Sequence, residues 1–295
     1  MSLTVGVLVT NYNSWDLALA CINATLDLCG TRLDRVMLLD DCSPTAPPHV
    51  TDARFELVRN QTNLGFAKTL NKGVAMLGTD IVIHFDADAK PLNNFLGTIV
   101  TEFSQDPSLA VLGFRAVDEN NDSMPSYDKE PNAFSLLLGQ QLYARSQAFW
   151  ERKERRICAW MCGLVIRRTA FDELGGFDEQ FDLLDLDLDF GMTVNRSLWK
   201  TKISQNLVIF HKGGGTPMLL SNRLLKFYRN RWLLLRKHGK IVYPKFARGV
   251  ILARLKIEYL LLHTLGAVLF LNAEIRQDKL DGRKRIIRHC QENYS

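Results

Sequence analysis

Two carboxylates stand two positions apart, directly after an apolar run of the chain. The run is Ile81–Phe85, and Asp86 and Asp88 follow it. A period of two places both side chains on the same side of an extended backbone, where they can share a divalent cation that bridges a diphosphate. An Asp-x-Asp motif alone usually marks a turn or a helix cap, but after a hydrophobic strand it favours a metal and diphosphate site.

A second acidic cluster lies farther along the chain. Its aspartates are interspersed with leucines: Asp182, Asp185, Asp187 and Asp189. Like charges this close raise the pKa of at least one member unless a cation or a donor intervenes. A carboxyl group with a raised pKa suits a general base or a metal site. The alternative interpretation is a solvated edge strand whose aspartates face water.

One histidine separates an apolar run from three glycines. His211 follows Ile203–Phe210 and precedes the glycines at 213–215. A neutral imidazole there can complete a cation site, and glycines let the backbone approach a phosphate or a sugar closely. A lone histidine is more often structural, so this interpretation depends on the aspartates.

Apolar runs that alternate with helical patterns must position these groups. The expected strands are Thr4–Thr10, Arg35–Leu39, Phe55–Val58, Ile81–Phe85, Leu109–Phe114 and Ile203–Phe210, and the expected helices are Trp15–Leu28, Ala67–Leu77 and Leu92–Phe103. Alternating strands and helices indicate an α/β fold, a parallel sheet with helices on both faces. Such sheets bind ligands at the carboxyl ends of their strands, which is where the acidic motifs fall.

Composition and charge limit the class of protein. The 295 residues are 46% hydrophobic and 23% charged, which excludes wholesale disorder, collagen-like repeats and a polytopic membrane protein. The net charge of +5 hides a gradient: residues 1–140 carry 9 basic and 17 acidic side chains, whereas residues 219–295 carry 17 and 5. A tail this basic suggests an anionic partner, either a membrane surface or nucleic acid, with a solvated basic helix as the alternative.

Cysteine spacing and the start of the chain both predict a reducing cytoplasm. No two of the six cysteines have Cys-x-x-Cys spacing, so buried free thiols are expected instead of a zinc or redox motif. The chain enters an apolar strand without a basic n-region, so no secretory signal is expected. The longest nearly uncharged apolar run, Tyr259–Leu271, is shorter than the roughly 17–25 residues of a bilayer span.

In their order along the chain, the motifs resemble those of glycosyltransferase family 2. More narrowly, they are similar to bacterial rhamnosyltransferase-like members that build surface polysaccharides. The resemblance covers roughly Leu3 to Gly239 and is carried by Val9–Asn13, Leu39–Ser43, Asn63–Ala67, Asn71–Gly73, Phe85–Asp88, Cys162–Gly163, Arg167–Arg168, Gly175–Glu179, the Asp187/Asp189 pair and His211. It implies a GT-A fold, a mostly parallel sheet with helices on both faces, over residues 1–218, and a C-terminal helical extension over residues 219–295.

The resemblance also assigns roles to the donor site. Asp40 is expected to recognise the nucleobase and Asp86 to touch the ribose. The metal, Mn²⁺ or Mg²⁺, is expected on Asp88 and His211 with Asp86. The full donor-binding set is Thr10, Asn11, Tyr12, Asp40, Asn63, Gly65, Asp86, Cys162 and Gly163.

The catalytic base is placed by counting forward from the Gly-Gly-Phe-Asp-Glu motif. The family commonly has Glu-Asp-x-Asp there, which puts the base on Asp187. Leu186 stands where the glutamate is expected, and Thr193 stands where an arginine is usual. Because a small shift of the loop would exchange the aspartates, Asp189 and Asp185 remain alternatives.

The implied function is an inverting, metal-dependent and non-processive sugar transfer. The expected donor is dTDP-L-rhamnose, and the expected acceptor is a polyprenyl-diphosphate-linked saccharide in cell-surface polysaccharide assembly. Galactofuranose, N-acetylhexosamine and other hexose donors are alternatives, as is a non-catalytic nucleotide-sugar-binding assembly protein. Tyr228 stands where processive synthases have a glutamine, which favours the addition of one or a few sugars.

The basic tail predicts where the enzyme works. Arginine and lysine alternate with Leu, Tyr and Trp from Arg223 to Lys240, a composition typical of a helix in a membrane interface. We therefore expect a peripheral enzyme on the cytoplasmic face of the plasma membrane, bound to anionic lipid and not to nucleic acid. The alternative is that Leu219–Arg248 packs on the transferase domain and the later helices form a homodimer. A basic run, Arg152–Arg156, is either a phosphate contact or an exposed charged helix.

Overall fold

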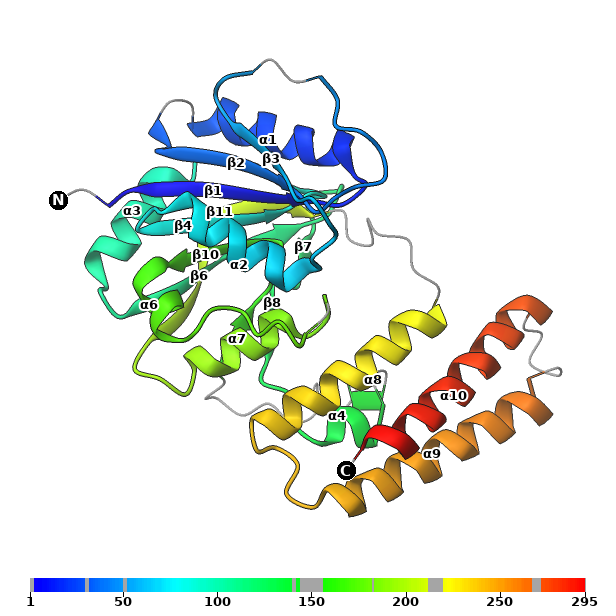
Figure 1. Ribbon diagram of the computed structural model, residues 1–295. Coiled ribbons are helices and arrows are strands. Elements are labelled where there is room, and N and C mark those ends of the chain that lie inside the picture. Colours follow the sequence, from blue (N-terminus) through cyan, green and yellow to red (C-terminus); the bar gives the residue numbers. More distant parts are fainter. Residues whose placement is uncertain are drawn as a thin grey trace. The chain divides into compact units, whose positions relative to one another are not determined.

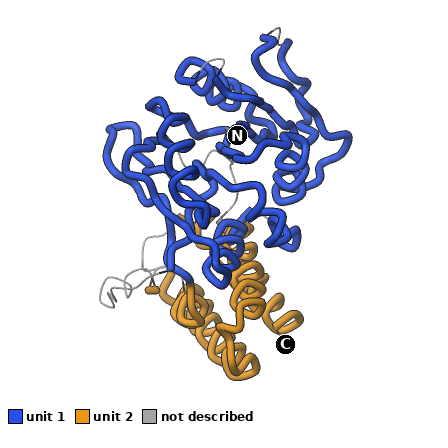
Figure 2. Tube along the Cα trace, turned by 90° about the vertical axis from the view of Figure 1, so that its left-hand side faces the viewer, with its two compact units in different colours: residues 1–130, 156–215 blue, residues 131–155, 216–295 orange. Residues whose placement is uncertain are grey.

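The chain forms two compact units. The computed structural model describes residues 3–29, 32–49, 52–139, 142–143, 156–181, 183–211, 220–266 and 272–294. The first unit is Met1–Glu130 with Arg156–Gly215, and the second is Pro131–Arg155 with Thr216–Ser295 (Figure 2). The second unit therefore contains residues 131–155, which the predicted division at 218 places with the transferase domain.

The first unit is built on a nine-stranded sheet. Its order is β3-β2-β1-β4-β10-β6-β11-β5, with β7 paired to β6 (Figure 1). The strands are β1 (Val5–Asn11), β2 (Arg35–Asp40), β3 (Glu56–Arg59), β4 (Ile81–Asp86), β5 (Ala89–Pro91), β6 (Leu109–Val117), β7 (Ser123–Met124), β10 (Gly163–Arg167) and β11 (Lys200–His211). Strands β3, β2, β1 and β4 are parallel, whereas β10 is antiparallel to both of its neighbours. The predicted α/β fold class is confirmed, and its sheet is mixed beyond β4.

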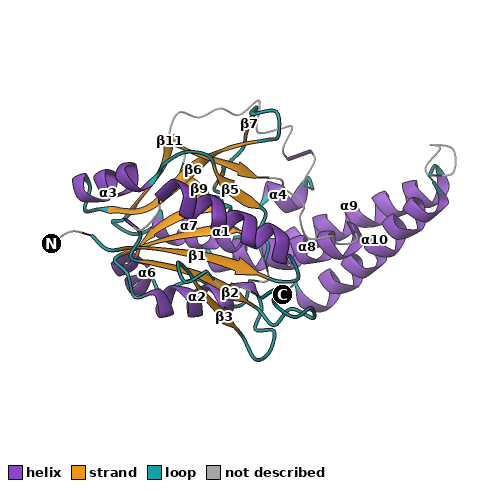
Figure 3. Cartoon of the chain, turned by 90° about the horizontal axis from the view of Figure 1, so that it is seen from above, coloured by secondary structure: helices purple, strands orange, loops and turns teal. Residues whose placement is uncertain are grey.

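Helices cover both faces of this sheet (Figure 3). They are α1 (Trp15–Cys29), α2 (Phe66–Leu77), α3 (Leu96–Gln105), α6 (Arg168–Glu173) and α7 (Leu186–Val194). Alternate residues of β1, such as Val7 and Val9, share one core cluster with Ile22 of α1. On the other face, Leu8 packs so closely on α2 that a Cβ at Gly73 would lie 2.6 Å from its side chain. Because both faces of β1 are covered, every residue of the strand is buried, including the polar Thr10 and Asn11 at its end.

Helix α3 begins later than its hydrophobic pattern predicts. The expected helix Leu92–Phe103 starts only at Leu96, and the segment before it continues from β5 (Ala89–Pro91), which pairs with β11. Asn93 then bonds to β11, donating to the carbonyl of Asn206 and accepting from the N–H of Val208. These contacts hold the segment extended before the helix starts.

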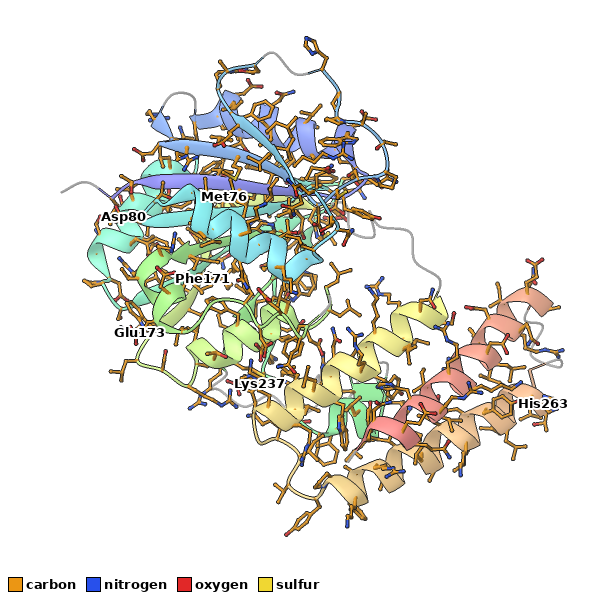
Figure 4. All side chains as sticks on the ribbon, in the orientation of Figure 1. Met76, Asp80, Phe171, Glu173, Lys237 and His263 are labelled. Carbon is orange, nitrogen blue, oxygen red and sulfur yellow. The ribbon has the colours of Figure 1, made fainter. Side chains whose placement is uncertain are left out.

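The amino ends of the strands are closed by structural contacts. Asp80, which precedes β4 (Figure 4), accepts hydrogen bonds from the backbone N–H and the hydroxyl of Thr4 at 2.9 and 2.8 Å. These bonds hold the pKa of Asp80 below its usual range. Polar side chains at this edge are thus occupied in joining strands.

Four helices of the second unit have described bounds, three of them long and one short. They are α4 (Phe134–Leu137), α8 (Leu220–Lys237), α9 (Pro244–Thr264) and α10 (Ala273–Asn293). Trp232 of α8 stacks on Tyr294 at 3.9 Å, and the Tyr294 hydroxyl donates to the carbonyl of Tyr228. Arg254 of α9 donates to the hydroxyl of Tyr228. The aromatic residues of the predicted interfacial helix are therefore largely buried within this unit.

Two further sequence predictions concern thiols and the membrane. All six cysteines are free, and only Cys42 is not buried. Among the helices that the structure describes, none combines the length and the apolar character needed to cross a bilayer. A second, two-stranded sheet is formed by β8 (Tyr127–Lys129) and β9 (Ile157–Ala159).

Candidate active site

The predicted polar residues meet at one edge of the sheet. Strand register pairs Asn11 with Asp40, and Thr10 with Asp86. On the other side of β4, Gly163 pairs with Phe85. The carboxyl ends of β1, β2 and β4 therefore bring together groups that are far apart in sequence.

A three-residue cluster at this edge can hold a metal ion. Asp86, Asp88 and His211 each offer one ligand atom, and these atoms lie within 4.8 Å of one another. Strand β5 delivers the histidine, because its Ala89 pairs with His211 of β11. The Nε2 atom of His211 lies 3.4 Å from Oδ1 of Asp88. Two carboxylates and one imidazole form a donor set suited to Mn²⁺ and acceptable to Mg²⁺.

The electrostatics of the cluster favour a bound cation. Burial and the charge of Asp88 raise the pKa of Asp86. A hydrogen bond to Asp88 raises the pKa of His211. The cluster thus places two carboxylates close together in a partly buried place, where a divalent ion would relieve the repulsion between them.

A buried histidine supports this edge from below and was not among the predicted site residues. His84 is 1% exposed, and its Nδ1 donates to the carbonyl of Met161 at 3.0 Å. That contact leaves Nε2 as the acceptor for the Thr10 hydroxyl at 3.1 Å. Burial lowers the pKa of His84 to about 4, so the ring is neutral. It links β1 and β4 to the residue before Cys162.

The predicted base, Asp187, stands in the first turn of α7. Burial, and then the charge of Asp185, raise its pKa to about 7. Asp128 and Asp86 also raise it, while a hydrogen bond from the N–H of Leu188 lowers it. Its proton affinity therefore matches proton transfer at neutral pH.

The two alternative bases are more buried than Asp187. Asp185 is 7% and Asp189 is 2% exposed, whereas Asp187 is partly exposed. Asp185 precedes α7 with a left-handed backbone, φ 63°, and Leu183 has φ 67°. Bulky residues in this region store strain. The arrangement supports Asp187 as the member that reaches a substrate.

Two anchors fix the segment that carries α7. Asn71 of α2 accepts from the N–H of Phe177 at 3.0 Å and donates to its carbonyl at 2.9 Å. The rings of Phe171 (Figure 4), Phe177 and Phe190 then pack with centroids 5.0–5.6 Å apart. The Asn71 and Gly-Gly-Phe motifs are thus one structural unit, a link that spacing along the chain does not reveal.

Cys162 is close enough to the acidic side chains of the site to be affected by their charges. It is 3% exposed, and the charges of Asp86, Asp187 and Asp88 all raise its pKa beyond that due to burial. The thiol is therefore neutral. At Gly163, an added Cβ would lie 3.1 Å from Ile209 and Phe114, so a larger residue would press on the core there.

Asp40, the expected nucleobase contact, is surrounded by donors from the protein itself. It is 0% exposed. Asn11 donates to it at 2.7 Å, Ser43 donates through its N–H and its hydroxyl, and Nε of Arg59 lies 3.2 Å away. A nucleobase would have to replace one of these donors. In the structure, Asp40 ties the loop after β1 to the loop after β2.

Asp41, which was not among the predicted site residues, organises the turn that contains Asn63 and Gly65 of the predicted donor-binding set. It is 6% exposed and accepts from the N–H of Leu64 at 2.8 Å and the N–H of Gly65 at 2.9 Å. Asn60 is a third donor at 2.9 Å. Asn63 is exposed in the same turn. The only sequence signal for this role was its position beside Asp40.

Other expected contacts are partly accessible or lie outside the described residues. Tyr12 is 50% exposed and Thr10 is 7% exposed. Asp182, the glycines at 213–215 and most of the Arg152–Arg156 run lie outside the described residues.

Comparison with known proteins places this edge in a recognised family. The family described as Glycosyl transferase family 2 matches residues 6–175. That range contains the ends of β1, β2 and β4 together with β10, and it stops before Asp187 and His211. The match therefore covers the predicted donor-binding residues but neither the predicted base nor the histidine of the cluster.

Relatives agree with this match. N-acetylglucosaminyl-diphospho-decaprenol L-rhamnosyltransferase of Mycobacterium tuberculosis is 26% identical over 242 residues, which are 72% of this chain and 78% of that protein. The mannosyltransferase PcManGT from Pyrobaculum calidifontis, in complex with GDP-Man and Mn²⁺, has a TM-score of 0.57 at 15% identity, covering 100% of this chain and 89% of that one. Residues 1–349 of S. aureus TarS give 0.51 at 16% identity, covering 98% and 81%. The two structures show a shared fold.

Proposed function

The chain belongs to glycosyl transferase family 2, and on this basis we propose an inverting, metal-dependent and non-processive sugar transfer. The observation that carries the proposal is the cluster of Asp86, Asp88 and His211, whose ligand atoms lie within 4.8 Å of one another. It stands beside Asp187, whose pKa the charge of Asp86 helps to raise. A cation at this site would offset the charge of the leaving nucleoside diphosphate, and a base with a pKa of about 7 can accept the proton of the attacking hydroxyl.

The chain's own residues supply the proton transfer and the positioning. Asp187 takes the proton of the acceptor hydroxyl while that oxygen bonds to the anomeric carbon. The bond from this carbon to the diphosphate breaks on the opposite face, and the nucleoside diphosphate leaves with the electron pair. A metal held by Asp86, Asp88 and His211 would offset the negative charge of that diphosphate. Asp41 meanwhile holds the turn that contains Gly65 in place.

The donor and acceptor are proposed from chemistry and from one relative. The M. tuberculosis relative is named for L-rhamnose transfer to a diphospho-decaprenol-linked sugar. We take dTDP-L-rhamnose as the donor and a polyprenyl-diphosphate-linked saccharide as the acceptor, in cell-surface polysaccharide assembly. Galactofuranose, N-acetylhexosamine and other hexose donors are the alternatives to test beside it.

A panel of nucleotide sugars tests the reaction. With Mn²⁺ or Mg²⁺ present, the correct donor should raise the melting temperature of the protein, because it binds the folded state only. Adding EDTA should abolish both this rise and the release of nucleoside diphosphate. If no donor raised the melting temperature or released nucleoside diphosphate with either metal, the metal-dependent transferase would be ruled out. A non-catalytic protein that binds a nucleotide sugar without turnover would show the raised melting temperature but no release of nucleoside diphosphate.

Attachment to a membrane is proposed for α9. Its exposed side chains include Phe246 (70%), Ile257 (58%) and Leu260 (59%), which recur at helical spacing on one face. Lys245 and Lys256 are exposed and lie three turns apart on one flank of that face. An apolar face flanked by lysines matches an anionic bilayer surface. We therefore place the enzyme at the cytoplasmic face of the plasma membrane, bound through α9.

Vesicle sedimentation tests the attachment. Phosphatidylglycerol vesicles should pull down the protein at low salt, phosphatidylcholine vesicles should not, and Leu260→Asp should weaken the binding. Leu198→Asp is the matched control, because Leu198 is 95% exposed in the first unit. If instead α9 joins two copies, Leu260→Asp would leave vesicle binding unchanged and convert a dimer to a monomer in analytical ultracentrifugation.

A further inference from the structure

A basic cavity lies within the second unit, between α8 and α10. Helix α8 contributes Lys226 and Arg229, and helix α10 contributes Arg285 and His289. The remaining lining residues are Asn222 and Leu225. None of the described lining residues is acidic. Neither the transfer reaction nor the apolar face of α9 uses this group.

Helix geometry explains why these side chains converge. On α8 the residues Asn222, Lys226 and Arg229 recur at spacings of four and three, so they share one face. On α10, Arg285 and His289 are four apart and also share a face.

The two faces are brought together by small residues. An added Cβ at Gly282 of α10 would lie 3.1 Å from the Cβ of Ser221 of α8, so the helices approach closely there. Arg285 donates to Asn222 at 2.7 Å across the same junction. The basic side chains are thus held on both sides of one cavity by helix packing.

The hydrogen-bonding character of the cavity is that of an anion site. Lys226, Arg229 and Arg285 are cationic side chains that can only donate hydrogen bonds. Nδ1 of His289 accepts from the side-chain amide of Asn293 at 3.1 Å, so the neutral ring carries its proton on Nε2. Burial and the charge of Arg229 lower the pKa of His289, while Glu292 raises it. The cavity therefore combines three positive charges with a neutral donor.

We propose that this cavity binds a diphosphate group, the one that links lipid and saccharide in the acceptor; this assignment rests on the proposed transferase function. A diphosphate diester is compact, doubly negative and rich in acceptor oxygens, so it can engage two guanidinium groups and an ammonium at once. An extended nucleic-acid backbone would call for a long basic stripe. Four basic side chains gathered around one short cavity that opens to solvent fit the smaller anion.

Calorimetric titration of the full-length protein with farnesyl diphosphate in EDTA tests the assignment. Replacing both arginines, Arg229→Ala with Arg285→Ala, should raise the dissociation constant at least about tenfold, because two charge-assisted hydrogen-bonding groups are lost. The matched control is Arg223→Ala with Arg288→Ala, a pair of exposed arginines on the same two helices outside the cavity. Asp88→Asn separates the two sites, since it should lower the transfer rate at limiting Mn²⁺ yet leave this binding unchanged.

The source of the diphosphate is read from competitors. Inorganic pyrophosphate that competes with farnesyl diphosphate supports recognition of the diphosphate itself, and a tighter constant for farnesyl diphosphate shows that the lipid adds affinity. Equal affinity of wild type, cavity variant and control variant would overturn the assignment. The assignment would also be overturned if neither farnesyl diphosphate nor pyrophosphate bound the wild type and the cavity variant lost binding to phosphatidylglycerol vesicles. A melting curve for each variant checks that it remains folded.

Discussion

Two pairs of aspartates lie on either side of β1, and the protein surrounds them differently. Asp40 and Asp41 follow β2, and each accepts hydrogen bonds from backbone amides and from neighbouring side chains. Asp86 and Asp88 follow β4 and cluster with His211, and Asp86 has a raised pKa. Both pairs are aspartates at the same edge of the sheet, and they differ in their surroundings. Donors of the protein hold the first pair in loop structure, whereas the second pair clusters with a histidine as candidate metal ligands.

This difference predicts opposite outcomes for substitutions. A carboxylate that many donors satisfy contributes to the stability of the fold, and removing it leaves buried donors without acceptors. A carboxylate whose pKa is raised by burial and like charges costs stability when it is ionised. Substitutions in the first pair should therefore lower stability, and those in the second pair, or at the base beside it, should lower activity alone.

The largest effect is expected at the base. Asp187→Asn should lower kcat by about 10²–10⁴-fold, because general-base catalysis contributes that much, while donor binding measured by calorimetry stays unchanged. Stability should move the other way. The folded pKa of about 7 lies above the ordinary value of 3.8, so the ionised carboxylate destabilises the fold increasingly as pH rises to about 7.

The melting temperature of Asp187→Asn should accordingly equal or exceed that of the wild type, by more at pH 8 than at pH 5. Asp189→Asn is the matched comparison, since Asp189 is 2% exposed in the same helix. A kcat reduced less than about 100-fold would show that the base is elsewhere.

The next largest effect is expected at the metal cluster, where replacing a ligand should lower the affinity for Mn²⁺. Asp88→Asn should weaken Mn²⁺ binding by about 10–100-fold or more, because even the outer-shell partners of metal ligands contribute that much. The transfer rate at limiting Mn²⁺ should fall in proportion and recover partly at high Mn²⁺. In EDTA the melting temperature should not fall. A variant that melted several degrees lower without metal would place Asp88 with the structural pair.

Substitutions of Asp40 or Asp41, which accept several hydrogen bonds from the protein, should lower stability. Asp41→Ala removes the acceptor of the Leu64 and Gly65 amides and of Asn60. The expected cost is about 1–3 kcal/mol, which lowers the melting temperature by about 2–4 °C per kcal/mol. Chemical denaturation measures the free energy of unfolding directly. A variant as stable as wild type would remove the contrast between the pairs.

The pH dependence gives a smaller test of the same contrast. Because Asp187 must be ionised to accept a proton and its pKa is about 7, kcat should rise with pH through about 7 and level off above it. Below the pKa the rate should fall about tenfold per pH unit. Asp187→Glu should retain a pH profile of this kind with a shifted midpoint. A flat profile between pH 5.5 and 8 would show that no such base limits the rate.

The sequence predicts the strand ends and the charged cluster better than it predicts their surroundings. Asp86, Asp88 and His211 were expected together because hydrophobic strands end at each of them and ligand sites gather at such ends. The structure brings them within 4.8 Å. Local patterns of period two and one family resemblance were sufficient for this part of the site.

The roles of single donors could not be predicted, because they depend on contacts between distant segments. Asp41 and Gly65 are separated by 24 positions, and His84 and Met161 by 77. No local pattern records such contacts. For the same reason the sequence did not show that β10 enters the sheet antiparallel, which turns the Cβ direction of Gly163 into the core.

The smallest predicted effect separates conformation from packing at two glycines of the site. Gly65 has φ 86° and ψ 160°, a region that only glycine occupies readily, yet an added Cβ there would meet nothing within 4 Å. Gly65→Ala should therefore lower the free energy of unfolding by about 1 kcal/mol through backbone strain. It should also raise the KM for the donor, because the N–H of Gly65 donates to Asp41. Gly163→Ala tests the other cause, because its Cβ would press on Ile209 and Phe114 at 3.1 Å. If Gly65→Ala changed neither the free energy of unfolding nor the KM, the turn would not depend on its hydrogen bond to Asp41. The contrast between the two aspartate pairs would then apply to stability and not to donor binding.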